Sequence, residues 1–132
     1  MIKTMKINTN TRTELVDITS HIKKIVDKSG TKSGICYIYV PHTTAAVTIN
    51  EGADPAVVRD MLMTLNEQYP QRADYHHMEG NSDAHIKTSL VGTSETVIIE
   101  NGKLLLGTWQ SIYFCEFDGA RNRNVHVKIM GE

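Results

Sequence analysis

The sequence predicts an α+β domain, built as a compact, mainly antiparallel β-sandwich-like domain with two or three helices. Three observations support this class. Several short segments are rich in β-branched and aromatic residues, two stretches show helical periodicity, and an Asn-Gly pair separates two apolar runs. The chain has 132 residues, which is enough for one hydrophobic core and too few for two. We therefore expect a single domain over residues 1–132.

The first two elements differ in the spacing of their apolar residues. Residues 2–8 alternate apolar and polar side chains, which predicts a half-buried strand. Within residues 17–27 the apolar side chains recur at helical spacing, and Gly30 follows. Because glycine is favoured just beyond a helix end, this segment is predicted to be a short helix.

Two strands and a second helix follow. Residues 34–40 and 45–50 are rich in strand-forming side chains, and Pro41 ends the first of these segments. Asp54 stands where an N-cap belongs, and Pro55 occupies the first helical position, where a missing N–H costs nothing. The sequence therefore predicts a helix that begins at this pair.

The last third of the chain is predicted to form strands. Asn101-Gly102 lies between the apolar runs 95–100 and 103–106, and such a pair favours a tight hairpin because the turn needs positive φ at both positions. Residues 109–117 and 124–130 are two further predicted strands, joined by a polar turn. About seven strands are thus expected in total.

Composition excludes several classes of protein. The formal net charge is −1, so no global field attracts a nucleic acid. No stretch is long and apolar enough for a membrane span, and the first residues do not resemble a signal peptide. Cys36 and Cys115 each lie in an apolar run and are expected to be buried thiols without a disulfide. We expect a soluble cytoplasmic protein.

Histidines are the first candidates for function. His42 follows a predicted strand at a turn, where it can enter a cleft or simply lie at the surface. His77 and His85 lie in the polar stretch 71–87, and a polar stretch of this length inside a compact domain is more often functional than not. The following residues, 86–91, fit either a short helix or a strand.

Imidazoles and carboxylates this close in sequence form an inventory of metal ligands, because neutral imidazole suits zinc, nickel, copper or iron. The spacing is not that of a helical zinc protease, and a polar loop with incidental histidines is the alternative. His76 and His77 are adjacent and should point in different directions, so at most one of them shares a site with His85.

Carboxylates and arginines supply further candidates. Glu51 precedes the second predicted helix and is a possible general base or a partner of a ligand residue, whereas Asp54 is expected to cap the helix. Arg121 and Arg123 lie in a polar turn, where they either bind phosphate or are merely solvated. Trp109 is expected in the core or at a subunit interface.

Three blocks of sequence resemble a known family. PHTTAAVTINEGADP, YHHMEGNSDAHIKTSLVG and GKLLLGTWQSIYFCEFDGAR, in this order, resemble the YjbQ-like family (UPF0047), some members of which carry the name secondary thiamine-phosphate synthase. The resemblance covers essentially the whole chain in one frame. It implies a single YjbQ-like domain with a compact β-rich fold that assembles as a homotrimer. One departure is Ala120, where the motif usually has proline.

The resemblance also implies which residues form the site. Three histidines would line it near the subunit contact, as ligands of a divalent metal, with zinc preferred: His42, His77 and His85. The other matched positions are Asn50, Glu51, Asn81, Asp83, Thr108, Gln110 and Arg121. Of these we expect catalytic roles for Glu51, Asp83 and Arg121, and cofactor or substrate binding by Asn81, Thr108 and Gln110.

The activity that the resemblance implies is the joining of a phosphorylated thiazole to a pyrimidine diphosphate, with release of pyrophosphate, as a main or a side activity. Charge on the leaving pyrophosphate would be neutralised by the metal and Arg121. Because an imidazole-rich site also suits zinc and an activated water, a metal-dependent phosphoester hydrolase is an alternative. A further alternative is a non-catalytic protein that binds a metal or a phosphorylated metabolite. In each case the expected partner is a small phosphorylated metabolite, not a nucleic acid or a membrane.

Overall fold

The computed structural model describes all residues from 1 to 132, and it has three helices and eight strands in two antiparallel sheets. The predicted α+β class is confirmed. The larger sheet has the strand order β1 (Ile2–Asn8), β8 (Asn122–Gly131), β3 (Gly34–Tyr39), β5 (Ser94–Glu100), β6 (Lys103–Leu104). The smaller sheet has the order β2 (Glu14–Asp17), β7 (Gln110–Glu116), β4 (Ala45–Glu51). The helices are α1 (Thr19–Ser29), α2 (Pro55–Gln68) and α3 (Ser82–Val91).

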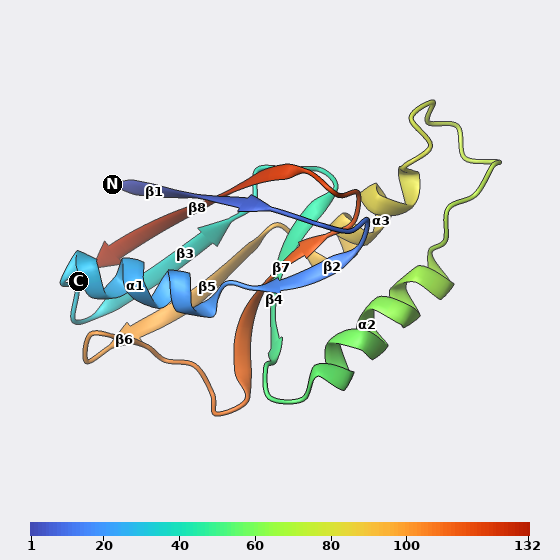
Figure 1. Cartoon of the computed structure of the whole chain (residues 1–132). Helices are drawn as coiled ribbons and strands as arrows, with labels where there is room; N and C mark the ends of the chain where they lie inside the picture. The colour runs from blue at the N-terminus through green and yellow to red at the C-terminus, as the bar shows by residue number, and fades with distance from the viewer.

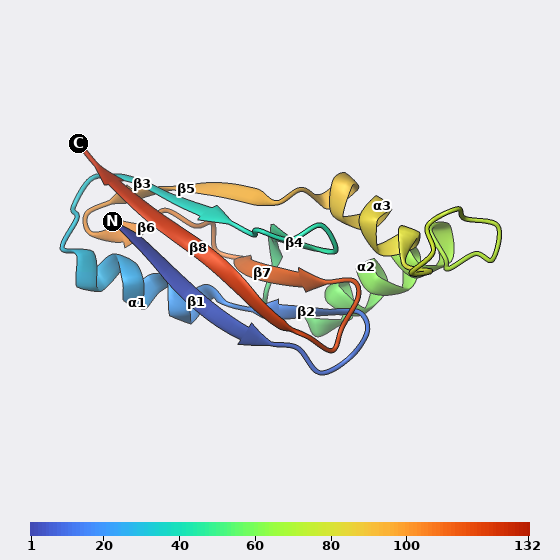
Figure 2. The same cartoon turned by 90° about the horizontal axis from the view of Figure 1, so that it is seen from above.

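The main hydrophobic core joins α1 to both sheets. α1 buries Ile22 and Val26, which lie four residues apart and therefore on one helical face. The same core cluster includes Ile38 of β3 and Val127 of β8 from the larger sheet, and Phe114 of β7 from the smaller one. Alternation along β3 and β8 turns every second side chain toward this core, as expected for a half-buried sheet. Figure 2 shows α1 alongside the larger sheet.

Local signals were confirmed at the hairpin and at the second helix. Asn101 and Gly102 both have positive φ, at 53° and 77°, in the turn between β5 and β6. The Asp54 side chain accepts a hydrogen bond from the Ala56 N–H at 2.9 Å and caps α2, with Pro55 as its first residue. Cys36 and Cys115 are buried free thiols.

Other expectations need correction. The predicted strand 103–106 is reduced to β6, and β2 was not predicted because four residues give little periodicity. The ambiguous segment 86–91 is the second half of α3, which begins earlier, at Ser82. Trp109 is 64% exposed and therefore does not belong to the core of this chain, whereas its alternative place at a subunit interface stays a prediction.

The fold brings the ends of several strands together at one corner of the molecule. β4 begins where β7 ends, since Ala45 pairs with Glu116, and β1 ends where β8 begins, since Asn8 pairs with Asn122. α3 lies beside this corner, and the irregular segment 69–81 that precedes α3 projects away from the body (Figure 1). None of the three helices is long and apolar enough to cross a lipid bilayer.

Candidate functional site

A polar cleft of about 340 Å³ opens at this corner, between α3 and the ends of the central strands. No hydrophobic side chain lines it. Its lining comes from three separate parts of the chain: His42, Thr43, Thr44, His77, Glu79, Asn81, His85, Asp118, Arg121 and Arg123. Five of the predicted site residues and matched positions, all three histidines among them, therefore meet in one cleft.

A buried ion pair forms the floor of the cleft. Arg123 is 6% exposed and donates through Nε to Glu116 Oε1 at 2.8 Å, and through Nη2 to Glu116 Oε2 and to Thr44 Oγ1. Glu116, which is fully buried, also accepts from Thr9 Oγ1 and from the backbone N–H of Asp118. Burial raises the pKa of Glu116, but these hydrogen bonds outweigh it and hold the pKa below its ordinary value.

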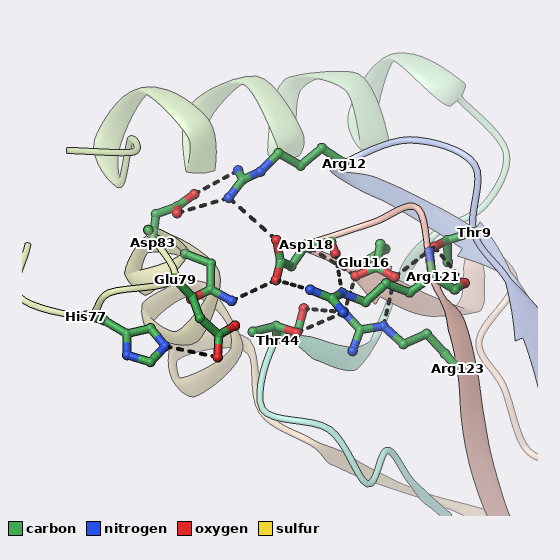
Figure 3. A network of polar contacts seen from close by, with 12 residues as sticks. Thr9, Arg12, Thr44, His77, Glu79, Asp83, Glu116, Asp118, Arg121 and Arg123 are labelled. Carbon is green, nitrogen blue, oxygen red and sulfur yellow. Dashed lines mark hydrogen bonds and ion pairs between the residues drawn. The ribbon is translucent and has the colours of Figure 1, made fainter. Parts of the chain in front are cut away.

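The second arginine of the cleft is held by a carboxylate. Arg121 donates through Nε to the Asp118 backbone carbonyl at 2.7 Å and through Nη2 to Asp118 Oδ2 at 3.0 Å. Asp118 Oδ2 also accepts from Asn81 Nδ2 at 2.8 Å. Arg12 lies 3.8 Å from the other carboxylate oxygen of Asp118 (Figure 3). Asp118 therefore fixes the positions of both Arg121 and Asn81 at the cleft.

Asp83 belongs to α3 but does not line the cleft. It is 1% exposed, receives two hydrogen bonds from Arg12 and lies 3.1 Å from the ammonium group of the equally buried Lys87. Burial raises the pKa of Asp83, but the bonds from Arg12 and Lys87 outweigh this effect and lower it overall. Lys87 also donates to Asn66 of α2. Asp83 thus links α3 to Arg12, in the segment between β1 and β2, and has the contacts of a structural ion pair.

The three histidines differ in their contacts. His42 Nε2 accepts the backbone N–H of Asn124 at 2.9 Å, so the proton of the neutral ring must sit on Nδ1. Burial and the nearby Arg123 charge lower the pKa of His42, which favours this neutral form. The rings of His77 and His85 meet edge to face with centroids 5.4 Å apart, and His77 Nε2 lies 3.8 Å from Glu79.

These contacts do not fit a zinc ion on all three imidazoles. The nitrogen of His42 that carries a free lone pair already accepts a hydrogen bond. No group of three or more histidine, cysteine or acidic side chains in the chain is arranged as metal ligands. A zinc site on these residues therefore stays a prediction, and it would require His42 to exchange its backbone partner for the metal.

The remaining predicted residues lie elsewhere. Glu51, Thr108 and Gln110 are at the other end of the smaller sheet, where Glu51 pairs with Gln110. β4 runs from Ala45 at the cleft end to Glu51, and these six residue steps span roughly 20 Å at about 3.3 Å per residue. Gln110 accepts the Gly107 N–H at 2.8 Å and closes the turn that contains Thr108. Within one chain these residues do not reach the histidines.

Sequence reasoning missed the residues that position the cleft. Arg123 was considered only as an alternative between phosphate binding and solvation, and Glu116, Asp118 and Thr9 were not singled out. Thr9 and Glu116 are 107 residues apart in the chain, so no spacing rule joins them. The available signal was the clustering of Glu116, Asp118, Arg121 and Arg123 around one turn.

Comparisons with known proteins agree over the whole chain. A family model described as "UPF0047 protein YjbQ-like" matches residues 3–132. The UPF0047 protein YugU of Bacillus subtilis is 53% identical over 132 residues, which cover 99% of this chain and all of that protein. The UPF0047 protein MJ1081 of Methanocaldococcus jannaschii is 55% identical over 132 residues, covering 100% of this chain and 96% of that protein.

Solved structures extend the similarity to three dimensions. A crystal structure from Clostridium acetobutylicum, described as an uncharacterized conserved protein of the yjbq/upf0047 family, is 54% identical with a TM-score of 0.95, over 97% of this chain and 99% of that chain. A YbjQ-like protein of unknown function from Sulfolobus solfataricus is 36% identical with a TM-score of 0.95, over 100% and 97% of the two chains. These descriptions name a family and no activity.

Proposed function

The chain belongs to the YjbQ-like UPF0047 family, and on that basis we propose that its polar cleft binds the phosphoryl group of a small phosphorylated metabolite. The observation that carries the proposal is the state of Arg123. Its Nε and Nη2 are fixed by Glu116 and Thr44, whereas its Nη1 has no hydrogen-bond partner in the chain. A buried guanidinium with a free N–H edge at a cleft is a preorganised anion donor.

Three groups near Arg123 support an anion-binding site. Arg121 also has a nitrogen, Nη1, that makes no hydrogen bond in the chain, and Asp118 holds the rest of its guanidinium in place. The neutral His42 offers an Nδ1–H donor. Asn81 begins α3 without a side-chain cap, so the first N–H groups of this ten-residue helix and their partial positive charge add to an anion site.

Group transfer does not require the cleft to position a general base, whereas hydrolysis does. Joining a thiazole phosphate to a pyrimidine diphosphate, as the family resemblance implies, requires a stabilised pyrophosphate leaving group and hardly any base, because the nucleophile is a ring nitrogen. Hydrolysis of a phosphoester requires a positioned base for water. Neither carboxylate that the sequence suggested as a base is available here, because Asp83 is occupied by two cations and Glu51 is distant. Transfer with pyrophosphate release, which needs no such base, is therefore the reaction class that we propose.

A homotrimer is part of the proposal. α2 has no buried residue, although Val57, Met61 and Leu65 recur on one of its faces. Glu51 and Gln110 match family motif positions but lie away from the cleft of their own chain. Both facts support an assembly in which neighbouring copies cover α2 and bring these residues to a site. Mass measurement by light scattering tests it, and a monomeric mass would contradict it.

Phosphate binding is tested by calorimetric titration with inorganic phosphate and with pyrophosphate. R121M should weaken binding about 10- to 100-fold, the loss expected for a charge-assisted hydrogen bond of about 1.5–3 kcal/mol. Arg59 on α2 makes no ion pair, so R59M is the matched control and should bind as the unmodified protein does. The proposal would be overturned if neither anion binds, or if R121M binds them as tightly as the unmodified protein does. Elemental analysis of the same preparation, with and without chelator, measures its zinc content and tests whether zinc is bound.

A further inference from the structure

The phosphate cleft continues into a second hollow of about 450 Å³ along α3. The two hollows share His42, Thr43 and His85, so they form one elongated cavity. The second hollow contains no hydrophobic and no charged side chain. What distinguishes it is a set of four hydroxyl groups: Thr43, Thr88, Ser89 and Thr93.

One face of α3 runs along this cavity from end to end. Asn81, His85 and Thr88 follow one another at spacings of four and three residues, which places them on the same side of a helix. The seven residue steps from Asn81 to Thr88 span about 10 Å at about 1.5 Å per step. The arginines lie at the Asn81 end and the hydroxyl groups at the Thr88 end. The cavity therefore has an anion-binding end with two arginines and an uncharged, hydrogen-bonding end.

Two polar atoms on this face lack partners. Asn81 is 6% exposed and Thr88 is 4% exposed, and neither Asn81 Oδ1 nor Thr88 Oγ1 makes a hydrogen bond. Asn81 Nδ2 donates to Asp118, which leaves Oδ1 as an acceptor in need of a donor. Buried polar groups without a partner are rare in folded proteins and usually reflect a missing ligand or water. A ligand that carries hydroxyl groups supplies such donors, whereas an apolar ring does not.

We propose, on the basis of the phosphate-binding function above, that the cavity takes the phosphate monoester of a polyhydroxylated compound, of the sugar phosphate class. The phosphoryl group lies at Arg121 and Arg123, and the hydroxyl chain or ring lies along His85 and Thr88. Sites lined with hydrogen-bonding groups reject ligands that leave those groups unpaired. A phosphate whose body is an apolar ring leaves these groups unpaired and is correspondingly a poor ligand.

The experiment compares three probes on the full-length protein by calorimetry: inorganic phosphate, ribose 5-phosphate and phenyl phosphate. Ribose 5-phosphate should bind at least about tenfold more tightly than inorganic phosphate, and phenyl phosphate should gain nothing. T88V keeps the shape of the side chain and removes its hydroxyl group, so the ratio of the ribose 5-phosphate to the inorganic phosphate affinity should fall about three- to tenfold. T96V, at an exposed threonine of β5 away from both hollows, is the control and should leave the ratio unchanged.

S89A provides a second variant at an exposed position of the same hollow, should T88V fail to fold. Equal affinity for phenyl phosphate and ribose 5-phosphate would overturn this inference while leaving phosphate binding intact. An unchanged ratio in the folded variants at Thr88 and Ser89 would do the same. Absence of binding by all three probes, inorganic phosphate included, would instead overturn the proposed function itself.

Discussion

Glu116 is the residue whose change most directly tests how the cleft is built. In E116Q, the carboxylate that neutralises Arg123 becomes a neutral amide. Thr9 and the Asp118 N–H donate to different oxygens of Glu116, so only one of these two donors keeps an oxygen as acceptor. Arg123 and Glu116 are 6% and 0% exposed, so the guanidinium is left as a buried charge without a counterion. Breaking a pair in this way costs about 3–5 kcal/mol of unfolding free energy. With an unfolding entropy of about 2.1 cal/mol/K per residue for 132 residues, the Tm should fall by roughly 11–18 °C.

Thermal unfolding by circular dichroism measures this shift, and E100Q, at an exposed β5 residue without an ion-pair partner, is the control and should change the Tm little. The double variant E116Q/R123M removes the uncompensated charge and should be more stable than E116Q, yet it should not recover phosphate binding. A Tm loss in E116Q as small as that in E100Q would refute the buried-pair argument. A double variant that still binds phosphate would refute the role of Arg123.

Three further results are expected. The pKa of Glu116 is lowered on folding, so its contribution to stability is complete above the ordinary value of 4.5 and is lost as the pH falls through the lower folded value; a Tm that stays constant between pH 6 and pH 3 would contradict this. Burial raises the thiol pKa of Cys36 to about 11 and of Cys115 to about 12, so neither should react with a disulfide reagent at pH 8 until the protein unfolds, and rapid labelling of the native protein would be the contrary result. His42 should show the Nδ1–H tautomer by ¹⁵N NMR and titrate below 6.5, whereas an Nε2–H ring would invalidate its assigned contact with Asn124.

The fold was predictable where the determinants are local. The Asn101-Gly102 turn and the Asp54 cap depend on the conformational preferences of one or two residues, and both form as predicted. α3 was not recognised because its buried face carries Asp83 and Lys87 in place of apolar side chains. A helix that buries an ion pair has no hydrophobic periodicity, so a pattern based on apolar residues cannot find its start.

The candidate site was predictable in part for a related reason. Residue type identified His42, His77 and His85, and the structure brings all three to one cleft. Residue type could not show that the nitrogen of His42 with the free lone pair is already occupied, because its partner is a backbone N–H 82 residues away. For the same reason it could not show that Glu51 and the histidines lie at opposite ends of the smaller sheet.

Apart from Glu79, which lies 3.8 Å from His77, the carboxylates near the cleft are paired with cations and favour binding over base catalysis. Glu116 holds Arg123, Asp118 holds Arg121, and Asp83 holds Arg12 and Lys87. A carboxylate paired with a guanidinium or ammonium has a lowered proton affinity, as Asp83 and Glu116 show, and is a poor general base. The same pairing fixes the guanidinium and gives its free N–H edge a defined direction, which improves anion recognition. Acidic residues that suggest metal ligation or proton transfer in the sequence thus serve, in the folded chain, to position the arginines for a phosphoryl group.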